Sequence, residues 1–160
     1  MLKFISFGSG SSGNCYYLFN ETEGLFIDVG IGTRTLKKYF REYGLSFALV
    51  RNVLVTHDHA DHVKSVGSFA NEFKLPVYAT RKVHEGILRN YCVQKKIDKE
   101  LVRYVEKGQS VNVGAFSVLP FSVPHDSNDN VGYRIECGGS SFCVMTDAGC
   151  VTEEMKECAG

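Results

Sequence analysis

Thr56-His57-Asp58-His59-Ala60-Asp61-His62 follows an apolar run, residues 53–56 (VLVT), that predicts a strand. Three imidazoles and two carboxylates within six residues are hard to explain as structure alone. Protonated histidines repel one another, and unpaired carboxylates in a partly buried turn lose hydration energy. A divalent metal removes both problems, because neutral imidazole and carboxylate are ligands of zinc, manganese and iron. We therefore interpret this stretch as a metal site. The side chains of His57 and His59 are expected to point in the same direction from the strand end, whereas Asp61 and His62 lie on the following helix. Two ligand pairs that point in different directions suit two metal ions.

Three further residues follow predicted strands and become candidates once the histidine run is recognised. His125 stands in Val123-Pro124-His125-Asp126, and Asp147 stands in Met145-Thr146-Asp147-Ala148-Gly149. Alone, each is more typical of a core or surface histidine or of a turn former. Asp28 also ends a predicted strand, and it is either a turn residue or an acceptor that orients a ligand histidine. His84 lies on a predicted helix rich in Lys and Glu and is expected on the surface.

A glycine-rich loop near the start of the chain matches the dinucleotide-binding motif in sequence but not in its predicted structural context. Gly8, Gly10 and Gly13 match G-x-G-x-x-G, but residues 14–19 predict another strand. A dinucleotide site needs a helix there, whose first amides receive the pyrophosphate. We expect instead a Gly/Ser turn, which is either an ordinary hairpin or a loop facing an anionic substrate. The polar groups it would offer are those of Ser9, Ser11, Ser12 and Asn14.

The pattern of strands and helices predicts the α/β class, of α+β type, with mixed sheets in a sandwich rather than a doubly wound parallel sheet. Helices are predicted from an N-cap at Thr33 to a stop at Gly44, and over residues 61–73 and 81–91. Strands are predicted at residues 2–7, 15–19, 24–28, 53–56, 77–79, 101–105, 110–113, 116–121, 131–136 and 142–145.

Composition predicts one globular domain over residues 1–160. The chain has 18 basic and 18 acidic residues and 44% hydrophobic residues, which argues against disorder and against a binder driven by bulk charge. It has no secretory signal and no apolar stretch that could span a membrane, so we expect a cytoplasmic protein with mostly buried cysteine thiols.

Charge is nevertheless unevenly distributed along the chain. Residues 74–107 hold nine basic and four acidic side chains, which predicts a basic face or simply a solvated helix surface.

The sequence resembles the metallo-β-lactamase superfamily through His57, His59, Asp61 and His62, then His125 and Asp147, with Asp28 earlier. Residues 8–15 (GSGSSGNC) and 124–127 (PHDS) make it similar to the YycJ/WalJ-type branch, whose members are exonuclease-like. The resemblance implies an αββα sandwich and two divalent ions, zinc or manganese, with iron also compatible. One ion would bind His57, His59 and His125, the second Asp61 and His62, with Asp147 between them. Asp61 and His62 would be the catalytic residues beside a hydroxide held by the metals.

In this superfamily a histidine from a later strand completes the second site, and no histidine follows His125. We therefore expect the N-terminal portion of the fold, with its C-terminal part absent and its open sheet covered by that part or by a second copy. The expected function is hydrolysis of phosphodiester bonds in nucleic acid. The alternatives are a thioester, lactam or other small-molecule ester hydrolase of the same fold, and a non-catalytic fragment that binds a metal or a partner.

Overall fold

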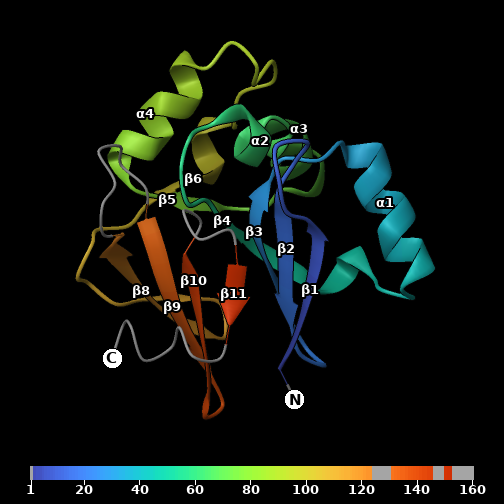
Figure 1. Ribbon diagram of the computed structural model, residues 1–160, viewed down its shortest axis with the longest axis vertical. Helices are drawn as coiled ribbons and strands as arrows, with labels where there is room; N and C mark the ends of the chain where they lie inside the picture. Colours follow the sequence, from blue (N-terminus) through green and yellow to red (C-terminus); the bar gives the residue numbers. More distant parts are fainter. Residues whose placement is uncertain (1, 124–130, 146–149, 153–160) are drawn as a thin grey trace.

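Two β-sheets pack against each other, and helices cover the outer side of the larger sheet in the computed structural model of the protein (Figure 1). The structure describes residues 2–123 and 131–145 and the backbone of 150–152. The larger sheet has six strands in the order of the chain: β1 (Lys3–Gly8), β2 (Cys15–Phe19), β3 (Gly24–Val29), β4 (Val50–Leu54), β5 (Val77–Ala79) and β6 (Val102–Tyr104).

The larger sheet is mixed, as predicted. Strands β1, β2 and β3 are antiparallel neighbours, whereas β3, β4, β5 and β6 run parallel. Parallel neighbours need crossover connections, which the helices supply. The carboxyl ends of these four parallel strands therefore meet at one border, which we call the carboxyl edge. The glycine-rich loop leads from β1 into β2 and not into a helix, so the prediction against a dinucleotide fold is confirmed.

The smaller sheet is antiparallel throughout, in the order β11-β10-β9-β8-β7. With the helices and the larger sheet it forms an αββ arrangement, and this confirms the predicted fold class. The hydroxyl of Tyr133 on β9 donates a hydrogen bond of 2.7 Å to the Val55 carbonyl, which ties the two sheets together beside the histidine run. The strands are β7 (Val111–Val113), β8 (Phe116–Ser122), β9 (Val131–Cys137), β10 (Ser140–Met145) and β11 (Cys150–Thr152).

The helices differ in detail from those predicted. Gly32, not Thr33, is the N-cap of the first helix. The single helix predicted over residues 61–73 is two helices, because the Ser65 amide leaves the helical pattern and donates to the Val29 carbonyl at 3.1 Å. No helix in the described ranges has the length and apolar character that crossing a bilayer requires. The helices are α1 (Thr33–Glu42), α2 (Ala60–Val63), α3 (Val66–Phe73) and α4 (Arg81–Arg89), with short 3-10 turns η1 (Phe47–Leu49) and η2 (Lys99–Leu101).

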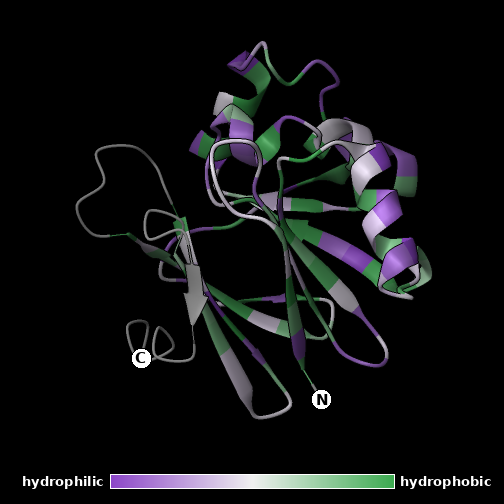
Figure 2. Ribbon diagram, turned by 45° about the vertical axis from the view of Figure 1, so that its right-hand side comes forward, coloured by the Kyte–Doolittle hydropathy of each residue, from purple (hydrophilic) through white to green (hydrophobic). Residues whose placement is uncertain are grey.

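The core between the larger sheet and its helices is aromatic. Phe26 on β3 packs against Phe40 of α1 and Phe69 of α3, with ring centroids 5.6 and 5.0 Å apart. All six residues of β3 are buried, because the strand has helices on one face and the smaller sheet on the other. Strands β2 and β3 are accordingly mostly apolar, while β4 carries Arg51 and Asn52, and α1 mixes polar and apolar residues (Figure 2).

The cysteines only partly follow the prediction of buried thiols. Cys15 and Cys143 are buried, Cys137 is half-buried and Cys92 is exposed. Burial, together with the nearby Asp28 carboxylate, raises the pKa of the Cys15 thiol well above its ordinary value, so this thiol stays protonated and unreactive. The prediction is therefore wrong for Cys92.

The prediction that His84 lies on the surface is also wrong. Its imidazole is buried beneath α4, where Nε2 lies 3.1 Å from the Val77 carbonyl oxygen and 2.8 Å from that of Arg103. These contacts link α4 to both β5 and β6. The charged residues of α4 misled the sequence interpretation, because His84 lies on the opposite, apolar face with Val83 and Ile87.

Acidification should destabilise the protein through His84. Burial lowers the pKa of His84 below its ordinary value, so the folded protein holds the neutral form. Its contribution to the free energy of unfolding is complete above about pH 6.5, the pKa in the unfolded chain, and is lost as the pH falls further. His84→Gln keeps a donor but cannot titrate. The free energy of unfolding is measured in urea between pH 7.5 and pH 5, with a metal chelator present. It should fall less steeply with decreasing pH for the variant than for the wild type. Equal slopes would contradict this assignment.

Candidate metal centre

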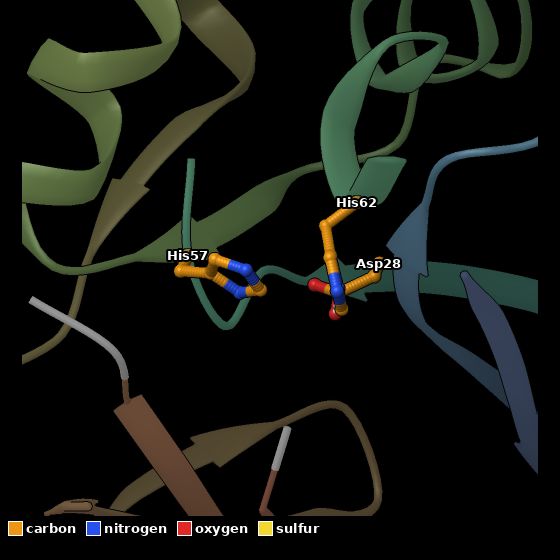
Figure 3. Close-up of side chains that lie close together, drawn as sticks. All are labelled: Asp28, His57 and His62. Carbon is orange, nitrogen blue, oxygen red and sulfur yellow. Dashed lines mark hydrogen bonds and ion pairs between the residues drawn. The ribbon is translucent and has the colours of Figure 1, made fainter. Parts of the chain in front are cut away.

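The carboxyl edge brings together side chains from β3, from the segment after β4 and from α2. Asp28 is the next-to-last residue of β3, His57 follows β4, and His62 lies within α2. Asp28, His57 and His62 form one group that could hold a metal ion, and His57, His59 and Asp61 form a second. Within each group one ligand atom per residue lies within 4.8 Å of the others. Figure 3 shows His57 directed toward the paired side chains of Asp28 and His62.

A hydrogen-bond chain determines which nitrogen of two histidines remains free. Asp28 Oδ2 accepts the hydroxyl proton of Thr56 at 2.6 Å and lies 2.6 Å from His62 Nδ1. A carboxylate can only accept, so His62 carries its proton on Nδ1. Thr56 has donated its only hydroxyl proton, and its oxygen therefore accepts from His57 Nδ1 at 3.1 Å. Both imidazoles thus keep the lone pair of Nε2, the atom that a metal requires.

Asp28 has an uncommon backbone conformation for a residue with a side chain. Its φ is +64°, in the left-handed region, and its side chain is completely buried. Besides its two contacts through Oδ2, the carboxylate accepts the Thr56 amide at Oδ1, at 2.8 Å. These hydrogen bonds offset the conformational cost, which is of order 1–3 kcal/mol. The arrangement supports the sequence interpretation of Asp28 as an acceptor that orients a histidine.

The imidazoles are close together, and the environment of His57 favours its neutral form. The ring centroid of His57 lies 3.9 Å from that of His62 and 4.6 Å from that of His59. Burial, and next the neighbouring His62, lower the pKa of His57 to about 4. A neutral histidine does not have to lose a proton before it binds a cation. A donor set of imidazoles and a carboxylate fits a divalent transition metal.

Asp61 and His62, the pair expected at the second ion, also lie side by side. His62 Nε2 is 3.9 Å from Asp61 Oδ2, and the Asp61 side chain is about one-third exposed. The glycine-rich loop fixes this carboxylate from the other side. The Asn14 side-chain amide donates to Asp61 Oδ2 at 3.1 Å and to the Asp61 carbonyl at 3.2 Å, and the Asn14 backbone amide donates to the same carbonyl at 2.7 Å.

The loop can approach this closely because Gly30 has no side chain. A Cβ at Gly30 would overlap the carbonyl oxygen of Asp61. The Gly30 amide instead donates to the Asn14 carbonyl at 2.9 Å, so the end of β3, the loop and α2 form one unit. Asn14 is buried in this unit, whereas Ser9, Ser11 and Ser12 are exposed at the tip of the loop.

The remaining candidates are placed as follows. Asp58 packs against α4, where a Cβ at Gly86 would overlap its carboxylate, and it belongs to neither of the two ligand groups. His125 and Asp147 lie outside the described residues. Sequence reasoning missed Thr56, although a hydroxyl residue directly before His57 was a usable signal. It also missed the contact between Asn14 and Asp61, for which no local signal exists.

Comparison with known proteins identifies the family. Residues 25–160 match the family described as the beta-lactamase superfamily domain. The chain belongs to this superfamily. The histidine run and the two ligand groups at the carboxyl edge are thus found in a metallo-β-lactamase fold, as the sequence resemblance implied.

Two curated relatives support the branch resemblance. The exodeoxyribonuclease YycJ of Bacillus anthracis is 30% identical over 155 residues, which are 97% of this chain and 58% of that protein. The exodeoxyribonuclease WalJ of Streptococcus pneumoniae is 29% identical over 153 residues, which are 96% of this chain and 56% of that protein. The chain thus spans a little over half the length of these relatives. A metallo-beta-lactamase from Cronobacter sakazakii, 13% identical, has the same fold with a TM-score of 0.69 over 86% of this chain and 58% of its own.

Removing the Asn14 side chain should weaken metal binding. Asn14→Ala frees the Asp61 carboxylate to move, and loss of a partner that orients a ligand lowers metal affinity about 10- to 100-fold. The measurement is chelator competition for Zn²⁺ and Mn²⁺. Asn71→Ala is the control, because the Asn71 side chain likewise bonds to a distant segment, donating to the Lys96 carbonyl and accepting from the Asp98 amide at 2.9 Å each, but it touches no candidate ligand. An equal loss of affinity in both variants would show a general effect on stability instead.

Proposed function

We propose that this chain carries a metal-dependent hydrolase site that cleaves phosphodiester bonds of nucleic acid. The observation behind this proposal is the meeting of three histidine and two aspartate side chains at the carboxyl edge. The Asp28 and Thr56 hydrogen bonds leave the Nε2 atoms of His57 and His62 free. The YycJ and WalJ relatives, both named exodeoxyribonucleases, support the choice of substrate.

We expect two neighbouring divalent ions at this site. His57 and His59 would hold the first ion, and Asp61 and His62 the second. His125 and Asp147 lie outside the described residues. His125 remains a predicted ligand of the first ion, and Asp147 remains a predicted ligand shared by both ions. Such ions supply Lewis acidity, which lowers the pKa of water toward neutrality and neutralises charge on a phosphoryl group. Zinc and manganese both accept this donor set, and iron is compatible with it.

The chain's own side chains hold the candidate metal ligands in position. Asp28 and Thr56 hold His62 and His57 in the tautomers that a metal needs. Asp61 is the partly exposed carboxylate of the site, and its contact with Asn14 leaves the remainder of the group able to accept a proton or to orient water. For this reason we keep Asp61, together with His62, as the proposed catalytic residues.

Charge on the neighbouring surface supports an anionic substrate. Residues 74–107, which include β5, α4 and β6, hold nine basic and four acidic side chains although the whole chain has a net charge of zero. Basic residues gathered beside a site raise the local concentration of a polyanion. The exposed hydroxyls of Ser9, Ser11 and Ser12 are further candidates for contact with a substrate phosphate. A cytoplasmic location and association through the smaller sheet stay predictions.

Substituting Asp61 should abolish cleavage, whereas substituting its neighbour Asp58 should not. Asp61→Asn removes one ligand charge but keeps an oxygen that can accept from Asn14. Because a metal site supplies several kcal/mol of charge stabilisation, turnover of 5′-phosphorylated DNA with Mn²⁺ should fall at least about 100-fold. Asp58→Asn changes the same kind of group in the same stretch, on the side that faces α4, and should retain most of the activity.

Parallel assays separate this function from its competitors. A thioester or lactam hydrolase of the same fold would turn over thioester or lactam reporters and leave DNA intact. A non-catalytic domain would cleave none of these substrates and would bind one ion or none when titrated with Zn²⁺ or Mn²⁺. Survival of DNA cleavage in both Asp61→Asn and His59→Ala would contradict the two-metal site itself.

A further inference from the structure

The carboxyl edge continues past the metal centre to two residues that the proposed mechanism does not use. Arg81 begins α4 directly after β5, and Tyr104 ends β6. Strands β4, β5 and β6 are parallel neighbours, with Leu54 opposite Tyr78 and Ala79 opposite Tyr104. Because adjacent strands are about 4.8 Å apart, two strand spacings, or about 10 Å, separate β4 and its histidines from β6.

Arg81 and Tyr104 form a flat, cationic and exposed pair. The Arg81 guanidinium carbon lies 4.3 Å from the centroid of the Tyr104 ring, and 51% of Tyr104 is exposed. The buried His84 ring meets Tyr104 edge-on with centroids 5.3 Å apart, so the tyrosine is held on its inner side. A guanidinium stacked on an aromatic ring is a surface on which another planar ring can stack.

A hollow of about 420 Å³ lies beside this pair, between α4 and β6. Apolar side chains form most of its wall, and one cation, Lys99, stands among them. Leu88 on its α4 side is a large apolar residue left exposed to solvent. The hollow therefore suits a planar, largely apolar group attached to an anion. The lining residues are His84, Ile87, Leu88, Ile97, Lys99, Val102 and Tyr104.

Helix α4 connects this surface rigidly to the metal centre. Its Gly86 receives the side chain of Asp58, and the Asn90 side chain that follows the helix donates to the Asp58 carbonyl at 2.8 Å. Asp58 lies between His57 and His59 in the chain. A group held by Arg81 and Tyr104 is thus kept at a constant distance from the histidines.

We propose that Arg81, Tyr104 and the adjoining hollow form a stacking site for a base of single-stranded nucleic acid, near the bond cleaved at the metal centre. This inference rests on the proposed function and specifies its substrate further. The local excess of positive charge in residues 74–107 favours a polyanion over an apolar peptide as the ligand. The nucleic acid has to be single-stranded, because bases within a duplex do not expose their faces. The site would recognise an unpaired base next to a phosphate.

Binding of a fluorescein-labelled oligothymidylate, followed by anisotropy in chelator, tests this site without any cleavage. Tyr104→Ala and Tyr104→Leu should weaken binding about 5- to 150-fold, the range that corresponds to losing one stacked base, while Tyr104→Phe should bind like the wild type. Arg81→Gln should also weaken binding and reduce its dependence on salt. Tyr91→Ala is the matched control, because Tyr91 is 89% exposed in the same basic segment but does not line the hollow.

Several results would overturn the inference. They are equal binding by Tyr104→Phe and Tyr104→Ala, a loss in Tyr91→Ala as large as that in Tyr104→Ala, and no binding of oligothymidylate by the wild type. If the wild type sediments as a dimer that Tyr104→Ala dissociates, the surface is a contact between copies of the chain. Failure of the proposed function is measured separately, because a wild type that binds the oligonucleotide but cleaves no DNA with Mn²⁺ keeps the stacking site and loses the nuclease.

Discussion

The buried carboxylate of Asp28 is the group on which the candidate site depends. It accepts hydrogen bonds from the Thr56 amide and hydroxyl and from His62, and through Thr56 it also determines the tautomer of His57. One acceptor thereby orients histidines that approach from two different elements. Its left-handed backbone conformation is strained, and it is retained because three hydrogen bonds compensate for the strain. A metal site assembled in this way has its geometry before any ion arrives.

Close backbone approach is the second requirement of the site. The end of β3, the glycine-rich loop and the start of α2 meet where Gly30 leaves room for the Asp61 carbonyl, and Asn14 fills the junction with hydrogen bonds. The loop therefore has two sides with different roles. Its inner side holds Asp61 in place, and its outer side presents serine hydroxyls to solvent. The glycines serve close backbone packing, because a Cβ at Gly8 would crowd the Gly13 carbonyl and a Cβ at Gly13 would crowd the Gly30 carbonyl.

The parallel half of the larger sheet places different chemistry at successive strand ends along one edge. A carboxylate lies at the end of β3, histidines follow β4, and a stacked Arg–Tyr pair lies at the ends of β5 and β6. Parallel strands align their carboxyl ends, so residues far apart in the chain share one surface.

The amino-acid sequence by itself was enough to select the candidate metal ligands and to predict much of the architecture. The run from His57 to His62 at a strand end predicted the metal site, and the patterning predicted the mixed sheets, because ligand type and apolar periodicity are local properties. Only the tertiary structure decided that Asn14 holds Asp61, that Thr56 joins Asp28 to His57, that His84 is buried and that the helix breaks at Ser65. Each of these features depends on a contact with a strand or loop distant in the chain or on which face of a helix is covered. Such partners become known only when the sheets and helices have packed.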